Sequence, residues 1–267
     1  ERGTFTDLFD SFHVGVKYAL AVGAASAAVG IVVGVINTTG VGFRLGFMVT
    51  SSAADMADSL HVVLGVIPLD IFTQASIQQF LSLVMIAIAC ILMGAGLPTT
   101  ALYIMLVAVA QPALAQLGVP PLATHMFVLY YGVISEITPP VCASAYAAAG
   151  IAGANPFKTG LSAFTLGIGK LMVPMVFVYA PTMLIVIEGH FTLVSFLQVS
   201  LSCALGVFLI ATTVSGYFLM MLTAWMRAVM LIAGLLLVAP SWGSDIVGLI
   251  IAAGMIALQL AMRKQTA

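Results

Sequence analysis

The chain has 267 residues, of which 62% are hydrophobic and 6% are charged, and its net charge is −1 at pH 7. Water-soluble domains normally carry about 25% charged residues, so this composition excludes a soluble globular fold. The longest basic run is Arg263-Lys264. Because binding to a phosphate backbone needs many Lys and Arg side chains, a nucleic-acid partner is excluded. Cys90, Cys142 and Cys203 lie far apart in apolar segments, a pattern that indicates neither a disulfide framework nor a zinc site.

Long apolar runs predict transmembrane helices, because a helix needs about 20 apolar residues to cross a hydrocarbon core about 30 Å thick. Four runs approach or exceed this length: Tyr18–Ile36, Leu161–Ile187, Leu193–Thr212 and Ile246–Ala261. We therefore predict an all-α, polytopic integral membrane protein of the lipid bilayer, with about six crossings and one hairpin. The chain starts at Glu1, and its first 17 residues are too polar for a signal peptide, so we expect a piece of a longer protein.

The segment Ser51–Ser76 contains three Asp and no Lys or Arg, and it is the longest stretch predicted not to span the membrane. Its apolar residues recur at helical spacing: Met56, Leu60, Val63, Leu64 and Ile67. We expect an amphipathic helix that lies on the outer membrane surface or that serves as a structural cap over the hairpin.

The positive-inside rule, which counts Lys and Arg in short loops near the ends of spans, gives an orientation. If Arg263 and Lys264 are cytoplasmic, the loops alternate toward the N-terminus: Ser241–Asp245 outside, Arg227 inside, Glu188–His190 outside and Lys158 inside. A span over Leu122–Ala149 continues this alternation. The count then closes only if Gln79–Leu117 enters and leaves on the same face, which predicts a re-entrant hairpin.

The tip of this hairpin is the first candidate site. Two apolar arms, Leu81–Met93 and Ala101–Leu117, flank the polar run Gly94–Thr100. Pro98 lacks an N–H, so the Gly94 carbonyl would lose its helical partner. In a bilayer such a break is tolerated only where protein or water covers it.

The second candidate site is the run Ser135–Pro140 inside an apolar segment. Pro139 and Pro140 remove the donors that the Ser135 and Glu136 carbonyls would use, so we expect these oxygens and the Thr138 hydroxyl to be available together. Small residues follow directly and favour close helix packing: Ala143, Ser144, Ala145, Ala147, Ala148, Ala149 and Gly150.

Two such breaks are typical of ion and substrate sites in secondary transporters. Unwound carbonyls can coordinate Na⁺ near the midplane, and half-helix N-termini can hold an anionic group. Glu136 is either a proton carrier or a cap in a water-filled vestibule, and Lys170 either pairs with it or extends to the cytoplasmic interface. The candidate binding residues are Gly94, Gly96, Leu97, Pro98, Thr99, Thr100, Ser135, Glu136, Thr138, Pro139 and Pro140. The coupling ion is Na⁺ or H⁺, with no other metal and no cofactor expected.

These motifs resemble a known family. The runs GAGLPTTA (94–101), SEITPPV (135–141) and AAAGIAG (147–153) look like the large membrane subunit of TRAP transporters, closest to the fused permeases of the TAXI branch. The similarity extends from about Val16 to Ile187, and the later helices resemble the additional C-terminal spans of those fusions.

The resemblance implies an elevator-type permease of the bacterial or archaeal cytoplasmic membrane. Such a permease takes up small organic anions, carboxylates above all, from a periplasmic substrate-binding protein and uses an ion gradient. Residues 1–187 would be the second inverted repeat, with the hairpin at about 79–117 and the broken helix at about 122–152, and residues 188–267 would be additional helices. The first repeat would belong to the remaining N-terminal half of the permease.

Two other readings stay open. The chain could be a structural or assembly subunit in which both breaks serve only packing. A membrane enzyme that uses Glu136 with Cys142 or His125 lacks a motif that places a nucleophile beside a base, and the apolar setting of Cys142 favours an inert thiol.

Overall fold

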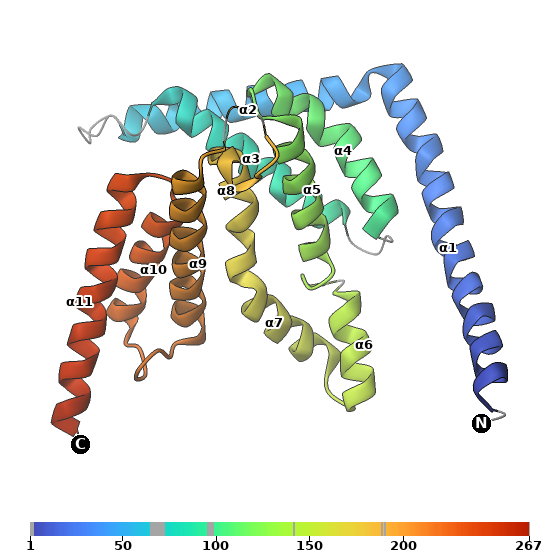
Figure 1. Cartoon of the computed structure of the whole chain (residues 1–267). Coiled ribbons are helices and arrows are strands. Elements are labelled where there is room, and N and C mark those ends of the chain that lie inside the picture. Colours follow the sequence, from blue (N-terminus) through green and yellow to red (C-terminus); the bar gives the residue numbers. More distant parts are fainter. Residues whose placement is uncertain are drawn as a thin grey trace. The chain divides into compact units, whose positions relative to one another are not determined.

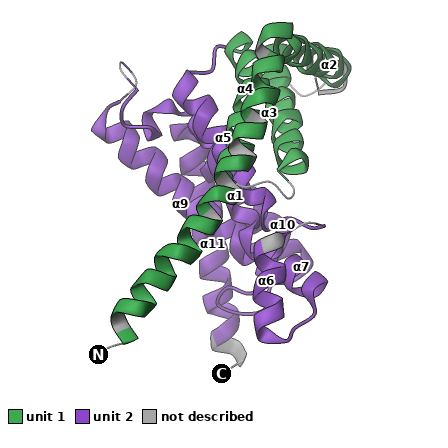
Figure 2. Cartoon of the chain, turned by 90° about the vertical axis from the view of Figure 1, so that its right-hand side faces the viewer, with its two compact units in different colours: residues 1–117 green, residues 118–267 purple. Residues whose placement is uncertain are grey.

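The structure is a computed structural model that describes residues 3–64, 73–94, 99–140, 142–187, 189 and 191–266. Over these ranges the regular elements are helices, and the only other pairing is an isolated bridge between Tyr217 and Met221. The predicted all-α fold is thus confirmed for the described residues. The chain divides into two compact units, residues 1–117 and 118–267 (Figure 1, Figure 2).

The first unit contains four helices in its described part: α1 (Gly3–Thr39), α2 (Val41–Leu64), α3 (Gln74–Met93) and α4 (Thr99–Gln116). Gly40, with φ of 67°, ends α1, and this left-handed conformation suits glycine because it has no Cβ. The chain turns there, so that Gly30–Ile36 and Val41–His61 are bent by 69°. The predicted span Tyr18–Ile36 is helical within the longer α1.

Small residues bring α2 against α4. A Cβ on Gly42 would lie 2.8 Å from the Ala108 carbonyl oxygen, and one on Gly46 would lie 2.9 Å from the Ala113 backbone nitrogen. Ala53 and Ala57 continue this buried face at helical spacing. The backbones of α2 and α4 therefore approach closely, as small residues allow in membrane helices.

The prediction for Ser51–Ser76 is partly corrected. The helix begins ten residues earlier, at Val41, and α3 already begins at Gln74. Met56 and Leu60 are exposed, whereas the buried face is formed by alanines and glycines. The predicted apolar stripe therefore does not pack inside this unit. The placement of Ile67 and the side chains of Val63 and Leu64 lie outside the described residues.

Both arms of the predicted hairpin are helices, α3 with 20 residues and α4 with 18. Thr73 caps α3, its side chain accepting a hydrogen bond from the Ser76 N–H. Each arm is long and apolar enough to cross a membrane. The re-entrant course stays a prediction, because helix length alone does not distinguish a hairpin from two full crossings.

The second unit begins with a broken helix and a segmented span. Its helices are α5 (Pro121–Ser135), α6 (Ala143–Ala152), α7 (Pro156–Gly167), η1 (Ile168–Leu171), α8 (Val173–Tyr179), η2 (Pro181–Met183), α9 (Leu193–Ser215), α10 (Ala224–Val238) and α11 (Trp242–Thr266). The predicted span Leu161–Ile187 is corrected to Pro156–Tyr179. It ends early because Ala180, with φ −132° and ψ 77°, precedes Pro181, which disfavours a helical conformation in the residue before it.

The last three helices pack as a bundle, α9 against α10 and α10 against α11. Gly206 and Gly234 meet at the first contact, since a Cβ on Gly206 would lie 2.7 Å from the Gly234 carbonyl oxygen. Buried residues of α11 alternate at spacings of three and four, as in coiled coils: Asp245, Gly248, Ala252, Met255 and Gln259. The predicted spans Leu193–Thr212 and Ile246–Ala261 are confirmed as the cores of α9 and α11.

The loops of the second unit alternate between two ends. In Figure 1, the α6–α7 connection, the α9–α10 loop and the end of α11 lie at one end, and the α10–α11 connection lies at the other. This alternation agrees with the one deduced from Lys158, Arg227 and Arg263. Trp225 and Trp242 are exposed and lie in the first turns of α10 and α11, as the interfacial aromatic belt predicts.

Candidate functional site

The proline break interrupts a helix at the predicted place. α5 ends at Ser135 and α6 begins at Ala143, and the intervening residues carry Pro139 and Pro140, whose peptide bond is cis. The prolines cannot donate to the preceding turn, so the helix stops before them. Val141 lies outside the described residues.

The backbone at this break corrects one sequence prediction. The Thr138 N–H donates to the Ser135 carbonyl over 3.1 Å, and the Glu136 and Ile137 N–H groups donate to Val133 and Ile134 over 3.2 and 3.1 Å. The prediction that the Ser135 carbonyl loses its donor is therefore wrong. A tighter three-residue turn replaces the missing four-residue bond. One lone pair of this oxygen remains for a further partner.

The hydroxyls of the break are held against α5. The Ser135 hydroxyl donates to the Gly132 carbonyl over 2.5 Å, and the Thr138 hydroxyl donates to the Ile134 carbonyl over 2.8 Å. Both protons are thus used within the helix, and both oxygens present lone pairs. Ser135 is buried and Thr138 is half-buried. The arrangement suits acceptance of a proton or a cation more than donation to an anion.

Two side chains of α6 reach back across the break. The Tyr146 hydroxyl donates to the Pro140 carbonyl over 2.7 Å. The Ser144 hydroxyl lies 3.4 Å from Oε2 of the half-buried Glu136, which is long for a hydrogen bond. Sequence reasoning missed Tyr146 as part of the site, and its only signal was a lone aromatic residue in an alanine-rich run.

The hairpin half of the site is described in part. Gly94 caps α3, its N–H donating to the Cys90 carbonyl over 2.9 Å. Thr99 is half-buried and begins α4, and Thr100 is exposed. Gly96, Leu97 and Pro98 lie outside the described residues. The hairpin belongs to the first compact unit and the break to the second.

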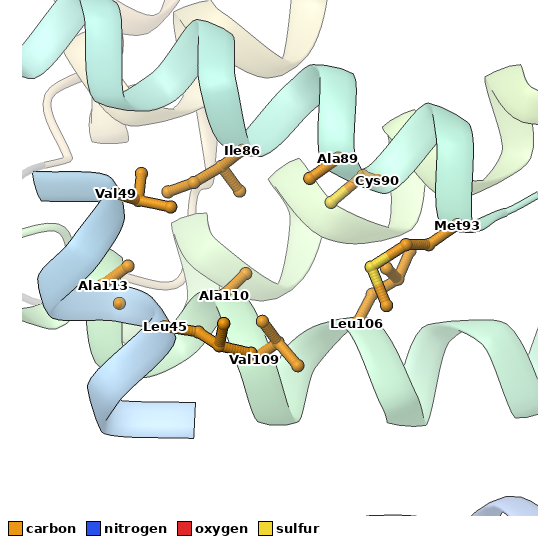
Figure 3. A pocket seen from close by; sticks show the side chains of 11 residues that line it. Leu45, Val49, Ile86, Ala89, Cys90, Met93, Leu106, Val109, Ala110 and Ala113 are labelled. Atoms are coloured by element: carbon orange, nitrogen blue, oxygen red, sulfur yellow. The ribbon is translucent and has the colours of Figure 1, made fainter. Parts of the chain in front are cut away.

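A cavity of about 40 Å³ lies between α2, α3 and α4 (Figure 3). Its lining is aliphatic apart from the sulfur atoms of Cys90 and Met93. Cys90 is buried as a free thiol, and burial of this kind keeps a thiol inert. A cavity whose only polar side chain is a thiol, a weak hydrogen-bonding group, cannot replace the hydration shell of an ion or a carboxylate. It is a packing defect between α2 and the two hairpin arms rather than a substrate site.

The remaining candidates are well separated or buried. His125 lies in α5 eleven residues before Glu136, about 16 Å along a helix. Cys142 is a free, fully buried thiol. Lys170 is exposed on η1, inside the span Pro156–Tyr179, and the buried Tyr131 hydroxyl donates to the neighbouring Leu171 carbonyl over 2.7 Å.

Comparison with family models gives a match to "Tripartite ATP-independent periplasmic transporter, DctM component" over residues 1–190. The chain belongs to the DctM family. The match includes the hairpin arms α3 and α4 and the whole break, and it ends before α9. Comparison with curated proteins and with solved structures finds no match.

Membership in the DctM family confirms the resemblance to TRAP transporters. DctM proteins are the large permease components of these transporters, and they work with a periplasmic binding protein and a small membrane subunit. The helices of this DctM chain agree: five in the described part are long and apolar enough to span a membrane, or six if the bent pair at Gly40 is counted as one span. The chain is a multi-pass membrane protein of a transporter family.

Proposed function

We propose that this chain forms the second half of the ion and substrate site in a TAXI-branch permease. The complete transporter takes up small organic anions across a bacterial or archaeal cytoplasmic membrane and uses an ion gradient. Residues 1–187 form the second inverted repeat of an elevator-type carrier, with a re-entrant hairpin at 79–117, and residues 188–267 are additional membrane helices. The first repeat is supplied by the N-terminal half of the permease.

The observation that carries this proposal is the break between α5 and α6. The C-terminal end of α5 presents carbonyl oxygens, whose partial negative charge favours a cation. The N-terminal end of α6 presents N–H groups, which favour an anion. Opposed half-helices of this kind are how membrane transporters place ion and substrate together near the midplane.

Glu136 gives this break a titratable group. A carboxyl group inside a membrane segment is costly, so it is usually paired, protonated or functional. Glu136 is half-buried directly after the last residue of α5 and beside the Ser144 hydroxyl. We propose that it carries the coupling proton, or that it shares a Na⁺ ion with the carbonyls of the turn.

The test is uptake into proteoliposomes that contain the complete permease, its small subunit and its binding protein. Proton and Na⁺ gradients are imposed separately on wild type, Glu136→Gln and Asp245→Asn. The last variant is a control, because Asp245 is another carboxylate of the second unit and is buried in the bundle of α9–α11, away from the break in the sequence.

Three results are distinguishable. Proton-driven uptake that is lost only in Glu136→Gln identifies Glu136 as the coupling residue. Equal Na⁺-driven uptake by all three proteins leaves the carbonyl oxygens of the break as the ion ligands. Absence of uptake by wild type in either gradient overturns the proposal and supports the structural or assembly subunit.

A further inference from the structure

One face of α7 touches both sides of the proline break. α7 carries two buried glycines, Gly160 and Gly167. They are seven residues apart, close to two full turns, so they share a face of the helix and lie about 10 Å apart along its axis. Each glycine meets a different side of the break.

At the first position, α7 packs against the start of α6. A Cβ on Gly160 would meet the Cys142 sulfur at less than contact distance, and it would lie 3.2 Å from Cε1 of Tyr146. Cys142 immediately precedes α6, and the Tyr146 hydroxyl donates a hydrogen bond to the Pro140 carbonyl. Gly160 therefore leaves room for the two residues that fix the α6 side of the break.

At the second position, α7 packs against the turn that follows α5. A Cβ on Gly167 would lie 2.5 Å from Cδ1 of Ile137, a separation that real Cβ atoms do not adopt. Ile137 lies between Glu136 and Thr138, two of the candidate site residues. A methyl group at Gly167 must turn the Cδ1 methyl of Ile137 aside, and where Ile137 has no room to turn, the clash shifts this turn or α7.

Two hydrogen bonds described here run from the α6 side of the break to the residues before it, one from the Tyr146 hydroxyl to the Pro140 carbonyl and one from the Cys142 N–H. The Cys142 N–H donates to the Thr138 carbonyl over 3.2 Å, and Pro139 and Pro140 donate nothing. The separation of the two half-helices therefore depends on what packs beside them. A single helix that touches both sides is suited to fix that separation.

We propose that Gly160 and Gly167 are positioning residues that set the gap between the half-helices, and hence the affinity of the ion site. This inference rests on the proposed function. Ion ligands must be held within about 0.5 Å of their productive positions, so a shift of the turn by only part of the overlap at Gly167 is enough to disturb them. The glycines themselves touch no ion, and they act through Ile137, Cys142 and Tyr146.

The test is a pair of rescue experiments in the complete transporter, with ion-dependent uptake measured over a range of ion concentrations. Gly167→Ala should raise the half-saturating ion concentration by about tenfold or more, since small displacements in a site are costly, while uptake at saturating ion stays within about twofold. Ile137→Val removes Cδ1, so the double variant should return toward the wild-type value. Gly160→Ala with Cys142→Ala forms the second pair, because Cys142→Ala removes the opposing sulfur.

Gly150→Ala is the matched control. Gly150 lies in α6, and a Cβ there would meet nothing within 4 Å. It should leave the half-saturating concentration unchanged. The thermal unfolding midpoint is measured for every variant, so that a loss of stability is separated from a loss of ion affinity.

The outcomes separate this inference from the proposed function. The positioning role is supported if each glycine substitution raises the half-saturating ion concentration and the second substitution lowers it toward the wild-type value. An unchanged half-saturating concentration in Gly167→Ala and Gly160→Ala, or a shift that neither second substitution restores, overturns it while wild-type uptake remains. Uptake by wild type that depends on no ion overturns the proposed function, and this is seen before any variant is compared.

Discussion

At the scale of single residues, Lys170 is an unusual cation for its place. It lies on the 3₁₀ turn between α7 and α8, inside the candidate span Pro156–Tyr179, and its side chain is exposed. Ionisable residues within membrane segments usually face a water-filled path or a ligand. Gly167, three residues earlier, packs against Ile137 of the break. A positive charge on this segment suits an anionic substrate.

We therefore expect Lys170→Met to raise the KM for the substrate by about tenfold or more, because a hydrogen bond to a charged group contributes about 1.5–3 kcal/mol. Lys170→Arg keeps the charge and should retain most of the affinity. The measurement is the concentration dependence of uptake with the substrate-loaded binding protein.

Lys158→Met is the control for Lys170→Met. Lys158 is exposed in the first turn of α7, at the other end of the same candidate span and next to the Asn155 cap, and its removal should not change KM. Equal changes in Lys158→Met and Lys170→Met would show a general effect of positive charge, and the assignment of Lys170 to the substrate would then be wrong.

At the scale of helices, the sequence predicted the break well and its hydrogen bonds poorly. Pro139 and Pro140 remove donors wherever they stand, so the end of α5 could be placed from residue types alone. The hydrogen bond from the Thr138 N–H to the Ser135 carbonyl could not be predicted in this way, because it depends on how the chain turns after the helix stops. Likewise, 25 glycines occur in the chain, and only the tertiary packing distinguishes Gly160 and Gly167 from the others.

The contact between α9 and α10 depends on such a glycine pair. A Cβ on Gly206 would lie 2.7 Å from the Gly234 carbonyl oxygen, and one on Gly234 would lie 3.0 Å from the Gly206 carbonyl oxygen. Gly206→Leu should therefore force the helices apart and destabilise the protein by about 1–3 kcal/mol, the usual cost of overpacking. The lower unfolding temperature would be measured in detergent.

Gly254→Leu provides the comparison for Gly206→Leu. Gly254 lies in α11, where an added Cβ would meet nothing within 4 Å, and the larger side chain can extend into lipid. Its unfolding temperature should equal that of wild type or exceed it, because glycine weakens a helix. If the two variants unfold at the same temperature, close approach at Gly206 does not stabilise the bundle.

At the scale of the whole molecule, the division into units 1–117 and 118–267 reflects packing, whereas the sequence suggested a boundary near residue 187 from the family resemblance. The boundary near residue 187 stays a prediction, although the DctM match also ends near it, at residue 190. The sidedness of the loops was predicted from a few Lys and Arg residues. Helix packing fixes which loops share an end, and only the charges indicate which end is cytoplasmic.

Cysteine labelling tests this sidedness. Cys90, Cys142 and Cys203 are buried and can be replaced to give a cysteine-free background. Ala154→Cys, in the exposed α6–α7 loop, should react with an impermeant maleimide only from the cytoplasmic side, and Ser241→Cys only from the outer side. Reaction of both positions from the same side of oriented vesicles would invalidate the predicted topology.

The tight contact of η1 with α9 has a mechanical consequence. A Cβ on Gly169 would lie 2.9 Å from Cγ1 of Val207, so these segments interlock. If the break-bearing segment slides through the bilayer as an elevator, α9, α10 and α11 must travel with it or this interlock must open in every cycle. In the first case the moving body drags three additional helices through lipid, and viscous friction limits its stroke rate. In the second case the turnover is limited by how fast the contact between Gly169 and Val207 can open and form again.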